Sequence, residues 1–164
     1  MSDDIDSGSE TQIVQPKSFS LIFFGSTPGL GAGETVELKS GLGAFIDINL
    51  LAKNVQYDVE VSASVSGFDP ANPATKFTGV GVIKQATVWH DGTTLFVDGV
   101  GVPLFTNGAA GNGNAHPANW AISAAHAVAP ERLAITFATG AGNTNKTNVV
   151  AQVTATAGPP VPAV

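Results

Sequence analysis

A glycine-rich segment near the C-terminus has the residue types of a phosphate-binding loop. The segment Gly140-Ala141-Gly142-Asn143-Thr144-Asn145-Lys146-Thr147 follows a strand-like run, as a P-loop does. However, Asn145 stands where a glycine is required before the lysine, and the residues after Thr147 favour a strand. Without a following helix there is no dipole and no ring of free N–H groups to hold a phosphate. We therefore predict a hairpin loop here and no nucleotide site.

The histidines and acidic residues form no recognisable metal or catalytic motif. His90, His116 and His126 lack the spacing of a metal-binding pair, and the sequence contains no Asp-x-Asp-x-Asp-Gly calcium loop. The chain has no cysteine, which excludes disulfides, thiolate ligands and a cysteine nucleophile. Two carboxylates distant in sequence could still meet as a glycosidase pair, and the sequence leaves that alternative open. We predict that the protein is not an enzyme and has no cofactor and no metal site.

The large amphipathic aromatic residues present two alternatives. Trp89 and Trp120 lie at the ends of strand-like runs, where an exposed ring can stack on a sugar and a buried ring belongs to the core. Tyr57 falls on the apolar face of its run, which favours the core. The core is favoured for Trp89 and Trp120 as well, and as the alternative these two residues, with the loop Thr106–Pro117, are the candidates for stacking on a glycan.

Charge is scarce and unevenly distributed along the chain. Of its 164 residues, 43% are hydrophobic and only 12% are charged, against about 25% in typical domains. Four of the thirteen acidic residues lie in the first ten residues, whereas all seven basic residues lie further along. So few basic residues argue against a nucleic-acid partner, and no apolar run has the length of a membrane span.

The two ends of the chain differ from the rest in composition. Residues 1–16 are acidic and polar and cannot offset their own ordering entropy, so we predict a flexible arm. Ile5, Ile13 and Val14 are its candidate anchors on a partner. This segment lacks the basic and apolar regions of a signal peptide, so we expect none. Residues 158–164 are predicted to be a proline-rich tail, which leaves a single domain at 17–157.

Strand patterns fill that domain. From Val55 to Val65, apolar residues alternate with polar ones over eleven residues, which indicates a half-buried antiparallel strand. Asp91-Gly92 separates two strand-like runs and predicts a hairpin. The segment Asn119–Val128 fits a short helix or a strand, and the strand is favoured because Pro130 follows. The other strand-like runs are Phe19–Phe24, Thr35–Lys39, Phe45–Ala52, Val82–His90, Thr94–Val100, Leu133–Phe137 and Val149–Ala155.

These elements predict an all-β fold, namely an antiparallel β-sandwich or jelly roll with about eight or nine strands. With so little charge, many exposed positions must carry small uncharged or apolar side chains. Such a surface loses little free energy of hydration when it is covered, which favours self-association.

Four segments of the domain together resemble modules of known proteins. They are Trp89-His90-Asp91-Gly92-Thr93-Thr94-Leu95, Trp120-Ala121-Ile122-Ser123, Leu133–Phe137 with Thr139-Gly140-Ala141, and Val149–Thr154. In this order they resemble the β-rich modules of bacteriophage virion structural proteins, of the capsid-decoration or head and tail fibre type.

The resemblance, which covers residues 80 to 156, implies a non-enzymatic virion component. Such a component is often a homotrimer, binds the major capsid protein or other virion proteins, and is assembled into particles in the bacterial cytoplasm. The alternative function is a carbohydrate-binding or adhesin domain that recognises surface glycans.

Overall fold

Alternation of apolar and polar residues builds the longest strands. The structure, a computed structural model, describes residues 17–41, 43, 45–98, 104–107, 120–142 and 144–162. Strand β5 (Val55–Asp69) buries every second residue as far as Gly67, and β11 (Lys146–Pro160) does so from Thr147 to Ala155. Because side chains alternate across a strand, one face of each joins the core and the other faces water. The period-two prediction is confirmed for both segments.

The described residues form eleven strands, eight with at least four residues and three with two or three. All of the strand pairs are antiparallel, which confirms the predicted all-β class. The other strands are β1 (Phe19–Thr27), β2 (Thr35–Glu37), β3 (Lys39–Ser40), β4 (Ile46–Asp47), β6 (Asn72–His90), β7 (Leu95–Asp98), β8 (Leu104–Asn107), β9 (Ala121–Ala127) and β10 (Arg132–Ala138).

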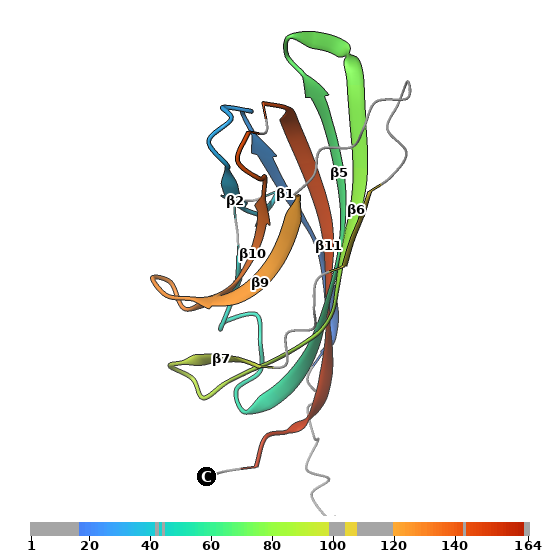
Figure 1. The fold of residues 1–164 in the computed structure, drawn as a ribbon. Coiled ribbons are helices and arrows are strands. Elements are labelled where there is room, and N and C mark those ends of the chain that lie inside the picture. Colours follow the sequence, from blue (N-terminus) through green and yellow to red (C-terminus); the bar gives the residue numbers. More distant parts are fainter. Residues whose placement is uncertain are drawn as a thin grey trace, which may run out of the picture.

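The strands make two sheets that pack face to face. In the larger sheet the order is β3-β1-β11-β5-β6-β7, and β8 also pairs with β6. In the smaller sheet β10 pairs with β9 along one side, while β2 and β4 share the other side. The smaller sheet covers one face of the larger, and the β5–β6 hairpin extends beyond it at one end (Figure 1). The opposite face of the larger sheet is its outer face.

The core fills the space between the sheets. Tyr57 is 1% exposed, and its hydroxyl accepts a hydrogen bond of 2.9 Å from the backbone N–H of Ala52, so its one polar atom is satisfied. Phe137 is completely buried and meets the ring of Trp120 edge-on at 6.0 Å. The prediction that Tyr57 belongs to the core is confirmed, and Trp120 belongs to it as well.

The segment 45–52 is mostly a turn, so the strand predicted there is wrong beyond Ile46–Asp47. The Asp47 carboxylate accepts a hydrogen bond from Asn49 N, and Asp47 O accepts one from Leu50 N. Asp and Asn side chains offer the backbone such local partners in place of a strand ladder. The local hydrogen bonds therefore outweigh the apolar composition of the run.

The segment around Trp120 is a strand, as favoured over the helix. In β9 the buried residues Ile122 and Ala124 alternate with exposed ones, in register with Trp120 just before the strand. Across the hairpin, Ile122 lies opposite Phe137 of β10. The alternation ends at His126, which is exposed because the strand there runs into the turn at 128–131.

The glycine-rich segment 140–147 is not a hairpin loop, which corrects the prediction. It joins β10 of the smaller sheet to β11 of the larger, so it crosses between the sheets. It packs against the loop that follows β1: Gly142 N donates to Gly31 O, and Glu34 N donates to Thr139 Oγ1. Gly29 has a φ of +78°, and a Cβ there would lie 2.5 Å from Thr144 O, so this close approach requires glycine.

Strand β11 continues through Pro160, three residues past the predicted end of the domain. The pairing with β5 shifts by one residue between Ala157 and Pro160, which accommodates the sequence Gly158-Pro159. Proline is compatible with a strand at such an irregularity because no ladder N–H is required of it there.

Candidate functional site

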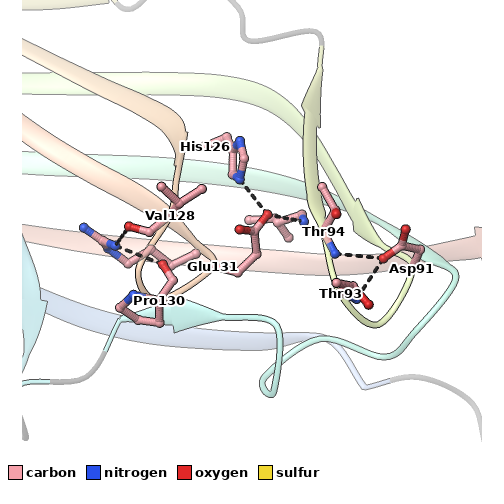
Figure 2. A network of polar contacts seen from close by, with 9 residues as sticks. Asp91, Thr93, Thr94, His126, Val128, Pro130 and Glu131 are labelled. Carbon is pink, nitrogen blue, oxygen red and sulfur yellow. Dashed lines mark hydrogen bonds and ion pairs between the residues drawn. The ribbon is translucent and has the colours of Figure 1, made fainter.

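A polar junction lies where the β6–β7 turn meets the β9–β10 turn (Figure 2). At its centre, Glu131 Oε1 is 2.7 Å from the backbone nitrogen of Leu95 and 2.6 Å from His126 Nε2. Leu95 begins β7, the last strand of the larger sheet in the described residues. The carboxylate therefore satisfies an N–H on a sheet edge and links the two sheets, one of the ways in which edge strands are protected.

Hydrogen bonds keep Glu131 ionised. The backbone N–H of Leu95 is the main cause that lowers the pKa of Glu131 below its ordinary value, and His126 lowers it further. Partial burial acts in the opposite direction but does not prevail. Glu131 therefore carries a negative charge, and His126 Nε2 can donate a hydrogen bond to it.

The β6–β7 turn is held by Asp91, which borders the junction (Figure 2). Its Oδ1 accepts hydrogen bonds of 2.8 Å from the backbone N–H groups of Thr93 and Thr94. These bonds lower the pKa of Asp91, with Thr94 as the largest cause. Gly92 has a φ of +101°, which the tight turn requires. The Asp91-Gly92 hairpin is confirmed.

Arg132 ties the β9–β10 turn to the rest of the smaller sheet. Its Nε and Nη2 atoms bind the two carboxylate oxygens of Glu37 at 2.6 and 2.8 Å, the two-pronged geometry that a guanidinium favours. Nη1 donates to the carbonyls of Val128 and Pro130. The pairing with Glu37 raises the pKa of Arg132. These bonds hold the turn that presents Glu131.

An aromatic groove lies beside the junction. The rings of Trp89 and Phe96 are stacked, with centroids 4.1 Å apart and planes at 13°. The groove has a volume of about 560 Å³. Its lining residues are Trp89, Thr94, Leu95, Phe96, Val97, Asp98 and His126.

The two predicted glycan-stacking residues lie in different environments in the fold. Trp89 is half-buried and lines the groove, whereas Trp120 is 5% exposed within the core and presents no ring face to a ligand. The candidate anchors Ile5, Ile13 and Val14 lie outside the described residues, as do His116 and most of the loop Thr106–Pro117.

His90 is buried beneath the β6–β7 turn and has a structural role. Its Nε2 lies 2.9 Å from the carbonyl of Leu51, and its Nδ1 accepts a hydrogen bond of 3.0 Å from Gly92 N. This pattern fits a neutral ring protonated at Nε2, with both nitrogens occupied. The ring therefore fixes the turn rather than offering a ligand atom.

Sequence reasoning missed Phe96, His126 and Glu131 as site residues. The Asp91-Gly92 signal, taken as a two-residue loop, would place Thr94 opposite Trp89. In the structure the register is shifted, and Phe96 lies opposite Trp89. No sequence signal brings Glu131 to Leu95, since the two residues belong to different sheets.

An uncharged surface occupies part of the outer face of the larger sheet, bordered by the exposed residues Lys39 of β3 and Glu60 of β5. Three rows run across its strands with exposed side chains: Ile22–Gln152–Ser62, Phe24–Val150–Ser64 and Ser26–Asn148–Ser66. Ile22, Phe24 and Val150 are 44 to 48% exposed. We call these nine residues of β1, β11 and β5 the uncharged face.

The described residues bear on two of the candidate chemistries. No group of three or more His, Asp or Glu residues there is arranged to hold a metal ion. In the same part of the chain, no helix has the length and apolar character needed to cross a membrane.

Comparisons with known proteins give one structural likeness. No protein-family model matches the sequence, and no curated protein matches it. Among solved structures, the tailspike protein of Acinetobacter baumannii phage AM24 is similar to 84% of this chain, with 12% sequence identity and a TM-score of 0.47. This chain spans 26% of the length of that protein. A TM-score of this size does not establish a common fold.

Proposed function

We propose that this chain is a non-enzymatic structural protein of a bacteriophage particle, either a capsid-decoration protein or a fibre subunit. It acts by associating with copies of itself and by attaching to other virion proteins. The uncharged face carries the proposal, and the resemblance of residues 80–156 to virion modules supports it.

The uncharged face is suited to close contact with a second surface. Nine neighbouring exposed positions without a charge are unusual on a surface that must remain in water, because charged residues normally supply solubility. Covering serine, asparagine and glutamine side chains costs far less than covering charges, and their hydroxyl and amide groups can bond across an interface. Ile22, Phe24 and Val150 add apolar area at its β1–β11 side.

The position of the acidic segment agrees with attachment through an arm. Residues 1–16 precede β1, which supplies one of the three strands of the uncharged face. The predicted arm would join the described chain at Lys17, five residues before Ile22 of that face. Ile5, Ile13 and Val14 are its apolar residues and would supply contacts on a neighbouring subunit or on the capsid.

The placement of Asp58 and Asp98 does not favour a glycosidase pair. Asp58 and Asp98 flank Thr87 in one row of the larger sheet, which sets them about 10 Å apart from the strand spacing. Both are exposed to water on the outer face. A glycosidase acid needs buried apolar surroundings that keep it protonated. Asp98 lines the aromatic groove, but its side chain, like that of Asp58, is exposed.

Quantifying the chain in purified virus particles tests this function. Particles produced with the full chain should carry it in a fixed ratio to the major capsid protein after density-gradient purification. A variant lacking residues 1–16 should be incorporated less, although its β-sandwich remains folded. Recovery of the full chain only in the particle-free fraction would refute the virion role, and equal incorporation of the shortened chain would refute the role of the arm.

A further inference from the structure

We propose that the aromatic groove binds a neutral saccharide, with a sugar ring packed on the exposed surface of the Trp89–Phe96 pair. This site lies at the opposite end of the larger sheet from the uncharged face. It is independent of the proposed virion role.

The aromatic pair supplies the packing surface. Trp89 and Phe96 are directly opposite each other on β6 and β7, and the flanking residues Val88, His90 and Leu95 point into the core. The two rings therefore project from the outer face. Stacking fixes them parallel to each other, and Phe96 is still 38% exposed. A rigid flat aromatic surface matches the apolar face of a pyranose ring and loses little side-chain entropy on binding.

Polar groups border this surface. Thr94, Asp98 and His126 line the same groove as the aromatic pair, so a hydroxyl, a carboxylate and an imidazole surround an apolar platform. A few polar groups around an apolar surface are the usual composition of a small-molecule site. The volume of about 560 Å³ lies within the range of known ligand pockets.

Glu131 determines which hydrogen bonds the imidazole of His126 can form with a ligand. His126 Nε2 lies 2.6 Å from the Glu131 carboxylate, which the Leu95 N–H helps keep ionised. A neutral ring bound in this way donates from Nε2 and leaves Nδ1 as an acceptor. Among the described residues, no hydrogen bond to His126 Nδ1 is present, so that nitrogen can form a hydrogen bond with a sugar hydroxyl.

The charges favour a neutral ligand over an acidic one. Asp98 lines the groove, and Glu131 lies directly behind His126. No lysine or arginine is among the described lining residues. A uronic acid or sialic acid would therefore meet the like charges of Asp98 and Glu131 with no lysine or arginine in the described lining. Acidic saccharides therefore serve as the control ligands for this site.

Nuclear magnetic resonance can test the site in the full chain, because the two tryptophans give separate indole N–H signals. The probes are the neutral oligosaccharides maltohexaose, cellohexaose and galactotetraose, and the acidic sialyllactose and trigalacturonic acid. We expect at least one neutral probe at about 10 mM, the range suited to millimolar affinity, to shift the Trp89 signal. The Trp120 signal should stay in place because that ring is buried.

Two variants complete the test. Trp89→Ala should weaken binding of the active probe at least tenfold. Because this variant lacks the Trp89 signal, binding is monitored through the shifts of the backbone amide signals of β7. Leu30→Ala, which removes an exposed apolar side chain from a loop outside both the groove and the uncharged face, should leave the affinity unchanged. An unchanged Trp120 signal in both variants shows that they are folded.

Three results would each overturn the proposal. The first is no Trp89 shift with any neutral probe, and the second is undiminished binding by Trp89→Ala. The third is tighter binding of the acidic probes than of the neutral ones. None of these results bears on incorporation into particles, so the saccharide site and the virion role are tested independently of each other.

Discussion

The two ends of the larger sheet present different surfaces from the same architecture. At the β1–β11 end, the outer face has nine exposed positions without a charge. At the β7 end, two stacked aromatic rings lie beside Asp98 and the His126–Glu131 pair. Both ends rest on the same core, so their difference comes from the outward-facing residues and, at β7, from His126 and Glu131 of the β9–β10 hairpin. A β-sandwich can therefore separate a surface for broad contact from a groove for a small ligand.

Removing Phe137 should have the largest effect, because the shared core supports both ends. The side chain is completely buried between the sheets and contacts Trp120. We expect Phe137→Ala to lower the free energy of unfolding by about 3–5 kcal/mol, as for other large core truncations. Urea unfolding followed by far-ultraviolet circular dichroism measures this. Phe137→Leu should lose much less, and equal losses would contradict the packing described for this position.

A charge in the uncharged face should affect only the β1–β11 end. Val150 lies at the centre of the nine residues, between Phe24 and Ser64. Because an interface would bury an unpaired ammonium group, we expect Val150→Lys to weaken self-association at least tenfold. Light scattering after size-exclusion chromatography, over a range of concentrations, reports the mass.

Two matched variants control for the effect of the lysine. Val150→Thr keeps the face uncharged and should retain the oligomer. Leu30→Lys places the same charge on a side chain that is 76% exposed in a loop away from this face. Dissociation by Leu30→Lys to the same extent would show that net charge, not this face, controls assembly.

Neutralising Glu131 should affect only the β7 end. Its folded-state pKa lies below the ordinary value of 4.5, so its stabilisation is present above that pH and is lost as the pH falls through the folded-state pKa. We expect Glu131→Gln to lower the Tm by a few degrees at neutral pH and to flatten the acid side of the pH–Tm curve.

The control for Glu131→Gln is Glu60→Gln, which neutralises an exposed carboxylate on β5. Differential scanning calorimetry between pH 3 and pH 7 compares the two variants with the parent. A Glu131→Gln curve parallel to that of the parent would show that the junction does not contribute to acid sensitivity.

The smallest effect is expected from Asp91→Asn. The amide oxygen can still accept the hydrogen bonds from Thr93 and Thr94, so the turn should remain. The lowered pKa of Asp91 means that the parent loses stability as the carboxylate is protonated, and the variant lacks that loss. The stability difference between pH 7 and pH 3 should therefore shrink slightly. A collapse of the hairpin, seen as loss of the Thr94 amide signal, would contradict this.

The local alternation of apolar and polar residues was sufficient to predict most of the strands. Val55–Val65 and Val149–Ala155 alternate so regularly that only a strand buries their apolar residues together. The same argument failed for Phe45–Ala52, because the hydrogen bonds of Asp47 form a turn that hydrophobic content does not reveal. It also failed for Gly140–Thr147, since a loop within a hairpin and a loop between sheets have the same composition.

The sequence by itself determined the all-β class, the Asp91-Gly92 hairpin and the burial of Tyr57. These follow from periods and turn residues that act within a few positions of each other. Only the tertiary structure decided that Trp89 faces a groove while Trp120 is buried, and that Glu131 reaches Leu95. Those outcomes depend on which strands of two sheets meet, and side chains far apart in sequence carry no local signal of that pairing.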